Sequence, residues 1–161
     1  MVLIGGSACI GSHWQAGRFD DGQVHYQMHE PGEGWQRLRL DAANAAWRNA
    51  RQRSSILVNS HCNGVEDAPL RVLSRHLLMG MENTEILQES EHTIAGRAAL
   101  ETSARGTLDG VPRQLQLLVL KKDGCVYDLV LEGHPGNFEA SLPAYQRLRD
   151  SWQIFRRRDW K

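Results

Sequence analysis

Several features are rare or missing in this sequence, and their absence excludes several classes of protein. It has no excess of either charge, because 19 Lys and Arg residues balance 19 Asp and Glu residues and the formal net charge at pH 7 is zero. A protein without net charge has no global field that draws it to nucleic acid or to anionic lipid. No apolar run approaches the roughly 20 residues that a membrane-spanning helix needs. We therefore expect no nucleic-acid partner and no multi-span membrane protein.

The common motifs of catalysis are also missing from the sequence. It contains no H-E-x-x-H zinc signature, no G-x-S-x-G nucleophile elbow, no phosphate-binding loop with its lysine, no dinucleotide fingerprint and no calcium loop. The glycine-rich stretch from Gly5 to Gly11 has no lysine that could reach a phosphate. We therefore expect no enzyme, no cofactor and no metal site.

The composition that remains is that of one soluble globular domain. The chain has 161 residues and a mass of 18.2 kDa, and 41% of its residues are hydrophobic. A domain of this size buries about 70% of the surface that its unfolded chain exposes, so a core can form without metal or disulfide support. The sequence predicts a single α+β domain over residues 23–156, preceded by a linker over 10–22 and followed by a basic tail over 157–161.

The first nine residues are typical of a processing segment. An apolar start gives way to the small residues Gly6, Ser7 and Ala8, directly before Cys9. This order resembles a bacterial lipobox, in which the cysteine receives a lipid and becomes the first residue of the mature protein. We interpret residues 1–9 as a truncated lipoprotein signal with Cys9 as the lipidation site. The alternative is a first strand or frayed end with a buried Cys9.

The two other cysteines, Cys62 and Cys125, are 63 positions apart and neither belongs to a C-x-x-C pair. In an exported protein an even pair of this kind favours a disulfide. Two separate buried thiols are the second interpretation. A zinc site made with His61 and His134 is the third, and its spacing fits no standard zinc finger.

The first half of the chain gives mixed signals. Alternating apolar residues predict a strand over 23–28, which a Pro-Gly turn connects to a second strand over 35–40 in a hairpin. The alanine-rich stretch 41–53 has helix-forming composition, and 54–60 is typical of a buried strand. Apolar spacing predicts a helix from Pro69 to about Met81, with Asp67 as its N-cap.

The second half is more regular. Strands are predicted over 84–94, 97–108, 111–120 and 125–131, and Asp109-Gly110 and Lys122-Asp123-Gly124 are strong turn signals between them. A last helix beginning at Ser141 has Tyr145, Leu148, Trp152 and Phe155 along one stripe. The fold class is therefore α+β, an antiparallel sheet covered by helices.

A few polar residues are candidates for a functional site, and each has an ordinary structural interpretation. His25 and His29 share a strand face about 13 Å apart, too far for one metal ion, and we expect both to be solvated. Asp128 lies on the strand face opposite to Cys125 and Tyr127. The basic residues around the C-terminus begin with Arg147 and Arg149, which we interpret as a solvated helix face; the tail that follows could contact anionic headgroups.

The order of these elements and several local motifs resemble one group of proteins. The motifs are Tyr26 to Trp35, Ile56 to Cys62, Pro69-Leu70, Leu77 to Gly80, Gly96-Arg97, Leu108 to Gly110, Lys122 to Leu129, and the aromatic spacing Phe138, Tyr145 and Trp152. Together they are similar to bacterial envelope lipoproteins of the PsbP/DcrB-like type, which fold as an α/β/α sandwich. The resemblance implies a lipid-anchored accessory protein with an antiparallel sheet between helices, and it does not imply an enzyme. We expect this protein to face the periplasm, anchored in the outer membrane.

Three hypotheses about function follow from these observations. The first is a non-enzymatic envelope protein, held at the membrane by its lipid, that binds or assembles an envelope protein partner. The second is a module that binds a small molecule or lipid in envelope transport, which requires an apolar pocket of about 300 Å³ or more. The third is a cytosolic thiol or zinc protein that uses His61, Cys62, Cys125 and His134.

Overall fold

The computed structural model of the chain describes residues 13–64 and 67–161. Its elements in chain order are β1 (Trp14–Gln15), β2 (Arg18–Asp20), β3 (His25–Gln27), β4 (Gln36–Leu38), β5 (Ala45–Asn49), β6 (Ser54–His61), α1 (Leu70–His76), β7 (Glu82–Ile94), β8 (Arg97–Leu108), β9 (Val111–Lys122), β10 (Cys125–Gly133), η1 (Pro135–Asn137), α2 (Phe138–Ser151), β11 (Gln153–Phe155) and η2 (Arg157–Asp159).

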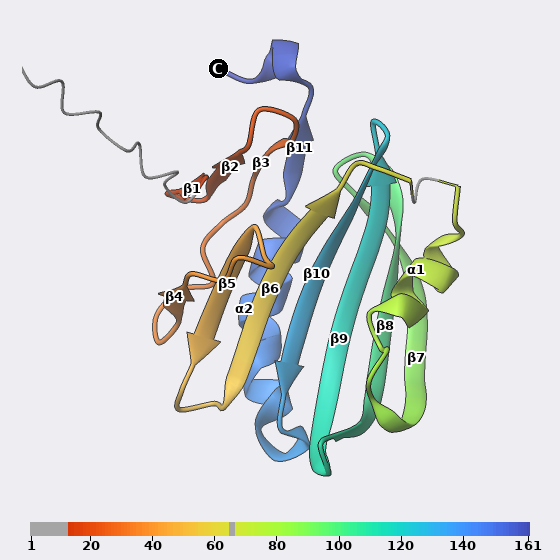
Figure 1. Cartoon of the computed structure of the whole chain (residues 1–161). Helices are drawn as coiled ribbons and strands as arrows, with labels where there is room; N and C mark the ends of the chain where they lie inside the picture. The colour runs from red at the N-terminus through yellow and green to blue at the C-terminus, as the bar shows by residue number, and fades with distance from the viewer. Residues whose placement is uncertain (1–12, 65–66) are drawn as a thin grey trace, which may run out of the picture.

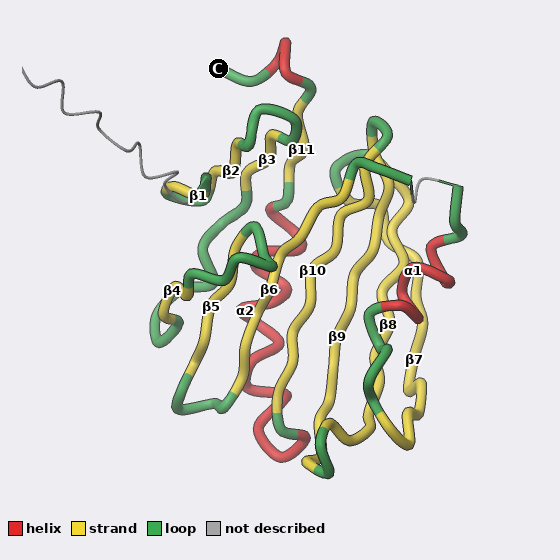
Figure 2. The backbone as a smooth tube through the Cα atoms, in the orientation of Figure 1, coloured by secondary structure: helices red, strands yellow, loops and turns green. Residues whose placement is uncertain are grey.

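The elements form three layers around one large antiparallel sheet. This sheet has seven strands in the order β4-β5-β6-β10-β9-β8-β7. Helix α2 lies behind the sheet and the short helix α1 lies in front of it (Figure 1). A second, smaller sheet in the order β1-β2-β3-β11 stands at the upper end, where Figure 2 shows its short strands in yellow. The predicted α+β class, an antiparallel sheet between helices, is confirmed.

Strands β7 to β10 form the meander that the sequence predicted. Asp109 and Gly110 have φ values of 49° and 75°, and Asp123 and Gly124 have 51° and 77°. Two-residue turns with positive φ at both positions match the twist of a hairpin, and Asp and Gly tolerate this backbone. Because Lys122 pairs with Cys125, the second turn is also a two-residue turn. These turns fix the register of the central strands.

The main core lies on the face of the sheet toward α2. It combines inward side chains of the central strands, such as Leu118, Leu129 and Leu131, with Tyr145 and Leu148 of α2. All five side chains are fully buried. Burying a side chain of this size contributes roughly 1.5–3 kcal/mol, so this face supplies most of the apolar stabilisation.

The face toward α1 is covered less completely. Helix α1 has seven residues and contacts β8 and β9. Its Leu73 packs against Val119 and Val126 in a small cluster that is separate from the main core. Near it, the Ser74 hydroxyl donates to Thr102 Oγ1 at 2.9 Å, which fixes the helix on β8.

The expected linker over 10–22 is wrong where the structure describes it, because β1 and β2 fall inside it. Trp14 and Phe19 from these strands are buried in the main core. Glu30 connects this region to the large sheet, since it accepts from Trp14 Nε1 and from Trp47 Nε1, both at 2.8 Å. Two- and three-residue strands are too short to show a period of two, so the sequence pattern did not reveal them.

The stretch 41–53, ambiguous in the sequence despite its helix-forming composition, contains the strand β5. Ala45 and Trp47 are buried against the main core, and β5 pairs with β6 along five residues. Alanine favours helix only weakly, and pairing with a neighbouring strand overrides that preference.

The predicted hairpin between 23–28 and 35–40 does not form. Strand β3 pairs with β2 and β11 in the small sheet, whereas β4 pairs with β5 in the large one. The turn after Met28 therefore carries the chain from one sheet to the other.

The ends of both helices differ from the prediction. Helix α1 begins after Pro69, so Asp67 is not its N-cap, and it ends at His76. Helix α2 begins at Phe138, three residues before Ser141, whose hydroxyl oxygen lies 2.8 Å from Ser54 Oγ. Beyond Ser151 the chain is extended, so Phe155 lies in β11 and not on the helix stripe.

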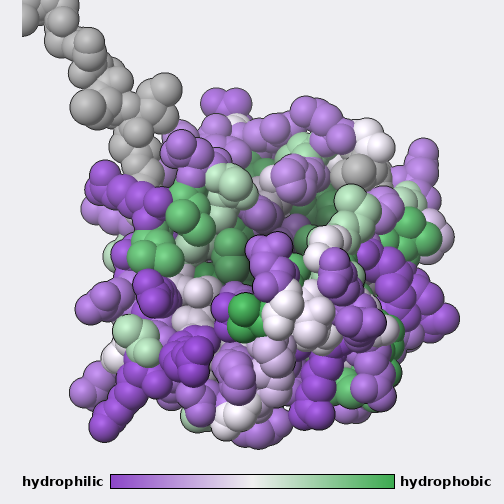
Figure 3. All heavy atoms as spheres, turned by 60° about the horizontal axis from the view of Figure 1, so that its bottom comes forward, coloured by the Kyte–Doolittle hydropathy of each residue, from purple (hydrophilic) through white to green (hydrophobic). Residues whose placement is uncertain are grey.

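The surface has no broad apolar area in the face that Figure 3 displays. That face is mainly hydrophilic, with apolar side chains in small separate patches. The large apolar side chains exposed among the described residues belong to different segments, namely Leu40, Val72, Met79, Leu87 and Val111. None of the helices over residues 13–64 and 67–161 has the length and hydrophobicity required to span a bilayer.

Candidate functional site

The predicted disulfide is present between Cys62 and Cys125. Cys62 directly follows β6 and Cys125 is the first residue of β10, so the bond joins two paired strands at one end of the sheet. Cys125 is buried in the main core. Cys9, the predicted lipidation site, and the rest of the signal segment 1–9 lie outside the described residues.

The alternative zinc site does not form. Both of its cysteines are used by the disulfide, and His61 and His134 lie at opposite ends of the paired strands β6 and β10. Seven strand steps separate these ends, which is about 23 Å. The His134 ring instead accepts from the Gly136 backbone N–H at 3.1 Å. Over 13–64 and 67–161, no three His, Cys, Asp or Glu side chains are grouped as metal ligands.

A wide cleft opens between the small sheet and the end of β6. We call it the polar cleft; its volume is about 730 Å³. Its walls come from β2 and the following turn, the segment between β4 and β5, and the end of β6. The lining residues are His13, Phe19, Asp21, Arg37, Arg39, Leu40, Asp41, Ala42, Ala43, Asn44, Asn59, Ser60 and His61.

Hydrogen bonds fix the inner wall of the polar cleft. Asn44 Oδ1 accepts from the Ser60 hydroxyl at 2.7 Å and from the Tyr26 hydroxyl at 3.3 Å. The Asn44 backbone N–H donates to Asn59 Oδ1 at 3.2 Å. Because these groups hold each other in place, the wall presents a defined set of amide and hydroxyl groups to solvent.

Arg37 supplies a fixed positive charge to the cleft. Its Nη1 donates to the backbone carbonyls of Leu38 and Ala46 at 2.6 and 3.0 Å. The guanidinium carbon lies 5.6 Å from the Trp14 ring centre and 5.3 Å from that of Trp47. Burial lowers the pKa of Arg37 from its ordinary value, and the nearby Glu30 carboxylate opposes that shift. The side chain stays cationic and well oriented.

A second, smaller hollow lies under α1, and we call it the α1 pocket. Its volume is about 190 Å³. Four apolar side chains form most of its wall, together with one carboxyl group and two imidazoles at the rim; the residues are Leu73, Leu77, Val119, Val126, Asp128, His61 and His76. His61 therefore lines both the α1 pocket and the polar cleft.

Asp128 is the unusual residue of the α1 pocket. It lies in the middle of β10 and only 5% of its surface is exposed. Burial raises the pKa of the Asp128 carboxyl to about 6, and the nearby His61 imidazole partly offsets the increase. Asp128 faces α1, while Cys125 and Tyr127 lie in the core on the opposite side, as the strand alternation predicted.

The sequence contains one signal for Asp128 besides the strand alternation. Asp128 is the single acid inside the apolar stretch from Cys125 to Leu131. An acid in the centre of a buried strand is costly unless something pairs with it.

His25 was expected to be solvated, and this expectation is wrong. Only 4% of its surface is exposed. Its Nδ1 lies 3.0 Å from Asp20 Oδ1, and its ring lies 5.7 Å from that of Trp160. Trp160 Nε1 also donates to Asp20, so the predicted basic tail folds back onto the small sheet. His29, in contrast, is exposed as expected.

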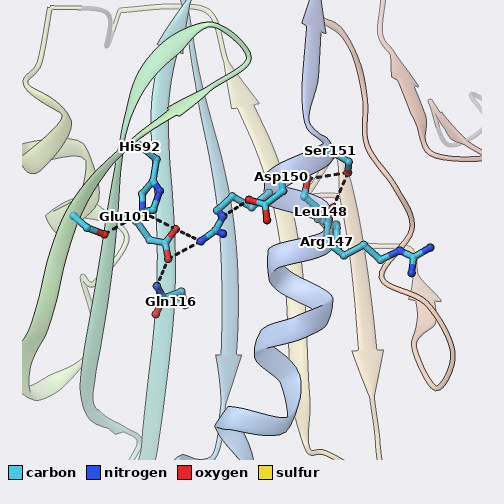
Figure 4. A network of polar contacts seen from close by, with 9 residues as sticks. His92, Glu101, Gln116, Arg147, Leu148, Asp150 and Ser151 are labelled. Carbon is cyan, nitrogen blue, oxygen red and sulfur yellow. Dashed lines mark hydrogen bonds and ion pairs between the residues drawn. The ribbon is translucent and has the colours of Figure 1, made fainter.

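Arg149 was expected on a solvated helix face, and it is instead part of a partly buried charge network (Figure 4). Its Nη1 donates to Glu101 Oε2 at 2.8 Å, and its Nε donates to Asp150. Gln116 Nε2 also donates to Glu101, and His92 Nε2 lies 3.5 Å from that carboxylate. Although burial opposes the charge, the hydrogen bonds to Asp150 and Glu101 hold the pKa of Arg149 above its ordinary value.

This network has a structural role. It connects the C-terminal part of α2 to β8 and β9, and the Arg149 and Glu101 side chains are 14% and 8% exposed. Because the carboxylate is already satisfied by its neighbours, it has little capacity left for a ligand.

No protein-family model matches the chain, and no curated protein sequence matches it. Solved structures show a likeness in fold. LpqN of Mycobacterium tuberculosis, described as involved in cell envelope biogenesis, has 13% identity and a TM-score of 0.62, and the match covers 85% of this chain and 87% of that one.

Two further structures agree with this fold. The cyanobacterial PsbP (CyanoP) of Synechocystis has 10% identity and a TM-score of 0.60, with 90% of this chain and 96% of that chain covered. A protein of Bacteroides thetaiotaomicron has 9% identity and a TM-score of 0.57, with 82% of this chain and 46% of that chain covered. At these identities the likeness shows the fold alone, and that fold is PsbP-like.

Proposed function

We propose that this chain is a non-enzymatic accessory protein of the bacterial cell envelope, which binds a partner protein in the polar cleft. The observation that carries the proposal is the cleft itself. It is wide and open, and its inner wall is a set of amide and hydroxyl groups held by internal hydrogen bonds around Asn44. A rigid polar surface of this kind binds a protein segment with little loss of side-chain entropy.

The envelope location has two lines of support. The Cys62–Cys125 disulfide is typical of proteins in an oxidising compartment. The fold is shared with LpqN, which is described as involved in cell envelope biogenesis. With the lipobox-like residues before Cys9, these observations favour a lipid-anchored protein that faces the periplasm, and we propose the outer membrane as its site.

The size and polarity of the hollows favour a protein partner over a drug-sized ligand. Pockets for such ligands usually measure 300–1,000 Å³ and are mainly apolar. The polar cleft is large enough but has charged residues of both signs on its rim, including Asp21, Arg39 and Asp41. The α1 pocket has apolar walls but measures about 190 Å³.

Site-specific photo-cross-linking in the source organism tests the binding role. A photoreactive amino acid replaces Arg39, which is exposed in the polar cleft, in the full-length chain. The matched control replaces Glu91, which is exposed on the distant edge strand β7. We expect a discrete cross-linked product from position 39 and none from position 91. Equal products from both positions, or none from either, would contradict the proposal.

The anchor needs its own test. Radiolabelled palmitate should enter the full-length protein, and Cys9→Ala should abolish the labelling and change the mobility of the protein on a gel. An unlabelled wild-type protein with the same mobility as Cys9→Ala would contradict the lipid anchor.

A further inference from the structure

The α1 pocket combines features that the fold does not require. A buried position in the middle of β10 would be most stable with an apolar side chain, as at Val126 and Val130 on the same face. Only 5% of the surface of Asp128 is exposed at that position. Across residues 13–64 and 67–161, the Asp128 carboxylate makes no hydrogen bond or ion pair, and the nearby His61 imidazole favours its ionised form.

The groups around the Asp128 carboxylate indicate which kind of ligand could bind to it. Leu73 of α1, Leu77 at its C-terminal end, and Val119 and Val126 of the sheet form an apolar wall, and Asp128 supplies the carboxylate among the described residues that line this interior. His61 and His76 are exposed at the rim. The free volume of about 190 Å³ equals roughly six water molecules, which is the size of a short aliphatic chain.

We propose that the α1 pocket binds a primary ammonium group carried on a short aliphatic chain. The ammonium donates hydrogen bonds to the Asp128 carboxylate, and the chain contacts Leu73, Leu77 and the two valines. A charge-assisted hydrogen bond in a site with little water is among the stronger polar contacts in proteins. An anion is repelled by the same carboxylate, and a metal ion lacks further ligands among the described residues.

Two sources could supply this chemistry, a free alkylamine or a lysine side chain of another protein. Both have an apolar stem that ends in a compact ammonium. His61 lines both the α1 pocket and the polar cleft, so the two hollows adjoin at this residue. A lysine of a protein bound in the polar cleft is therefore one source of the ammonium group. The ammonium site itself does not depend on the proposed function.

Calorimetric titration of the full chain tests the proposal, at about pH 8, where the Asp128 carboxyl is ionised. The probes are n-pentylamine and its neutral analogue n-pentanol. We expect pentylamine to bind at least tenfold more tightly than pentanol. Equal affinities, or no binding of pentylamine, would overturn the proposal.

Three variants identify the group that binds. Asp128→Asn keeps the shape of the side chain and should weaken pentylamine binding at least tenfold. Leu77→Trp should fill the pocket and give a similar loss with the carboxylate intact. The control is Glu132→Gln on the same strand face, where Glu132 already pairs with Arg113 at 2.8 Å, and its affinity should match wild type. An Asp128→Asn protein that binds pentylamine as wild type does would overturn the assignment.

A second ligand distinguishes the two sources. Nα-acetyl-lysine N-methylamide presents the lysine side chain with a peptide backbone attached. Affinity equal to or above that of pentylamine assigns the pocket to a lysine side chain, whereas affinity at least tenfold lower assigns it to a free amine. Cross-linking from position 39 tests the polar cleft and does not involve α1. The proposed function and the amine site can therefore be contradicted independently of each other.

Discussion

The two faces of strand β10 differ in how completely they are packed. The face toward α2 has Cys125, Tyr127, Leu129 and Leu131, all buried in the main core. The face toward α1 alternates with it and includes Asp128, in a pocket that a seven-residue helix covers only in part. Asp128 lowers the stability of one face of β10, while the other face is fully packed. A destabilising residue at such a position indicates a functional constraint.

The disulfide belongs to the packed face and should give the largest single effect. Replacing both Cys62 and Cys125 by serine opens a 63-residue loop, which costs about 4 kcal/mol of unfolding free energy in the chain-entropy model. Urea denaturation of oxidised wild type and of the double variant measures this difference. Reduced wild type should match the variant, and a difference below about 1 kcal/mol would mean that the bond contributes little to the fold.

A matched pair of leucines compares the two faces directly. Leu148 of α2 is fully buried in the main core, whereas Leu73 of α1 borders the α1 pocket. We expect Leu148→Ala to lower the unfolding free energy by about 3–4 kcal/mol and Leu73→Ala by about 2 kcal/mol, because a residue beside an existing hollow loses fewer contacts. Equal losses in urea denaturation would show that the two faces are packed equally well.

The sequence predicted the packed meander well and the regions around it less well. Strands β7 to β10 are long, alternate clearly and are joined by local turn signals such as Asp109-Gly110. Strand β5 was missed because its alanines favour helix in isolation, and only pairing with β6 makes it extended. Strands β1 and β2 are too short to show a pattern.

The site was less predictable than the fold because its parts are distant in sequence. Asp128 was placed on the correct face by simple alternation. The pocket around it depends on how α1, more than 50 positions earlier, packs on the sheet, and no local pattern encodes that contact. Arg149 was misjudged for the same reason, since its partner Glu101 lies on β8.

Asp128→Asn should change the unfolding free energy in the opposite direction, because it stabilises the folded protein. The pKa of Asp128 is about 6 in the folded protein and near 3.8 when the chain is unfolded. A group with a raised folded pKa binds its proton more tightly in the folded state, so its stabilisation is complete below about pH 4 and is lost as the pH rises to about 6. The shift of about two pKa units corresponds to ~3 kcal/mol or somewhat less.

The asparagine variant cannot ionise, so it should keep that stability at neutral pH. We expect its unfolding free energy to equal that of wild type near pH 4 and to exceed it by about 2–3 kcal/mol above pH 7. Urea denaturation of both proteins across this pH range measures the difference in unfolding free energy. Other groups, such as Asp20, titrate in the same way in both proteins, so their contributions cancel. Parallel curves would show that Asp128 is not destabilised by burial. A variant that is more stable than wild type and yet no longer binds pentylamine would separate the two roles of β10, because the loss of binding could not then be attributed to unfolding.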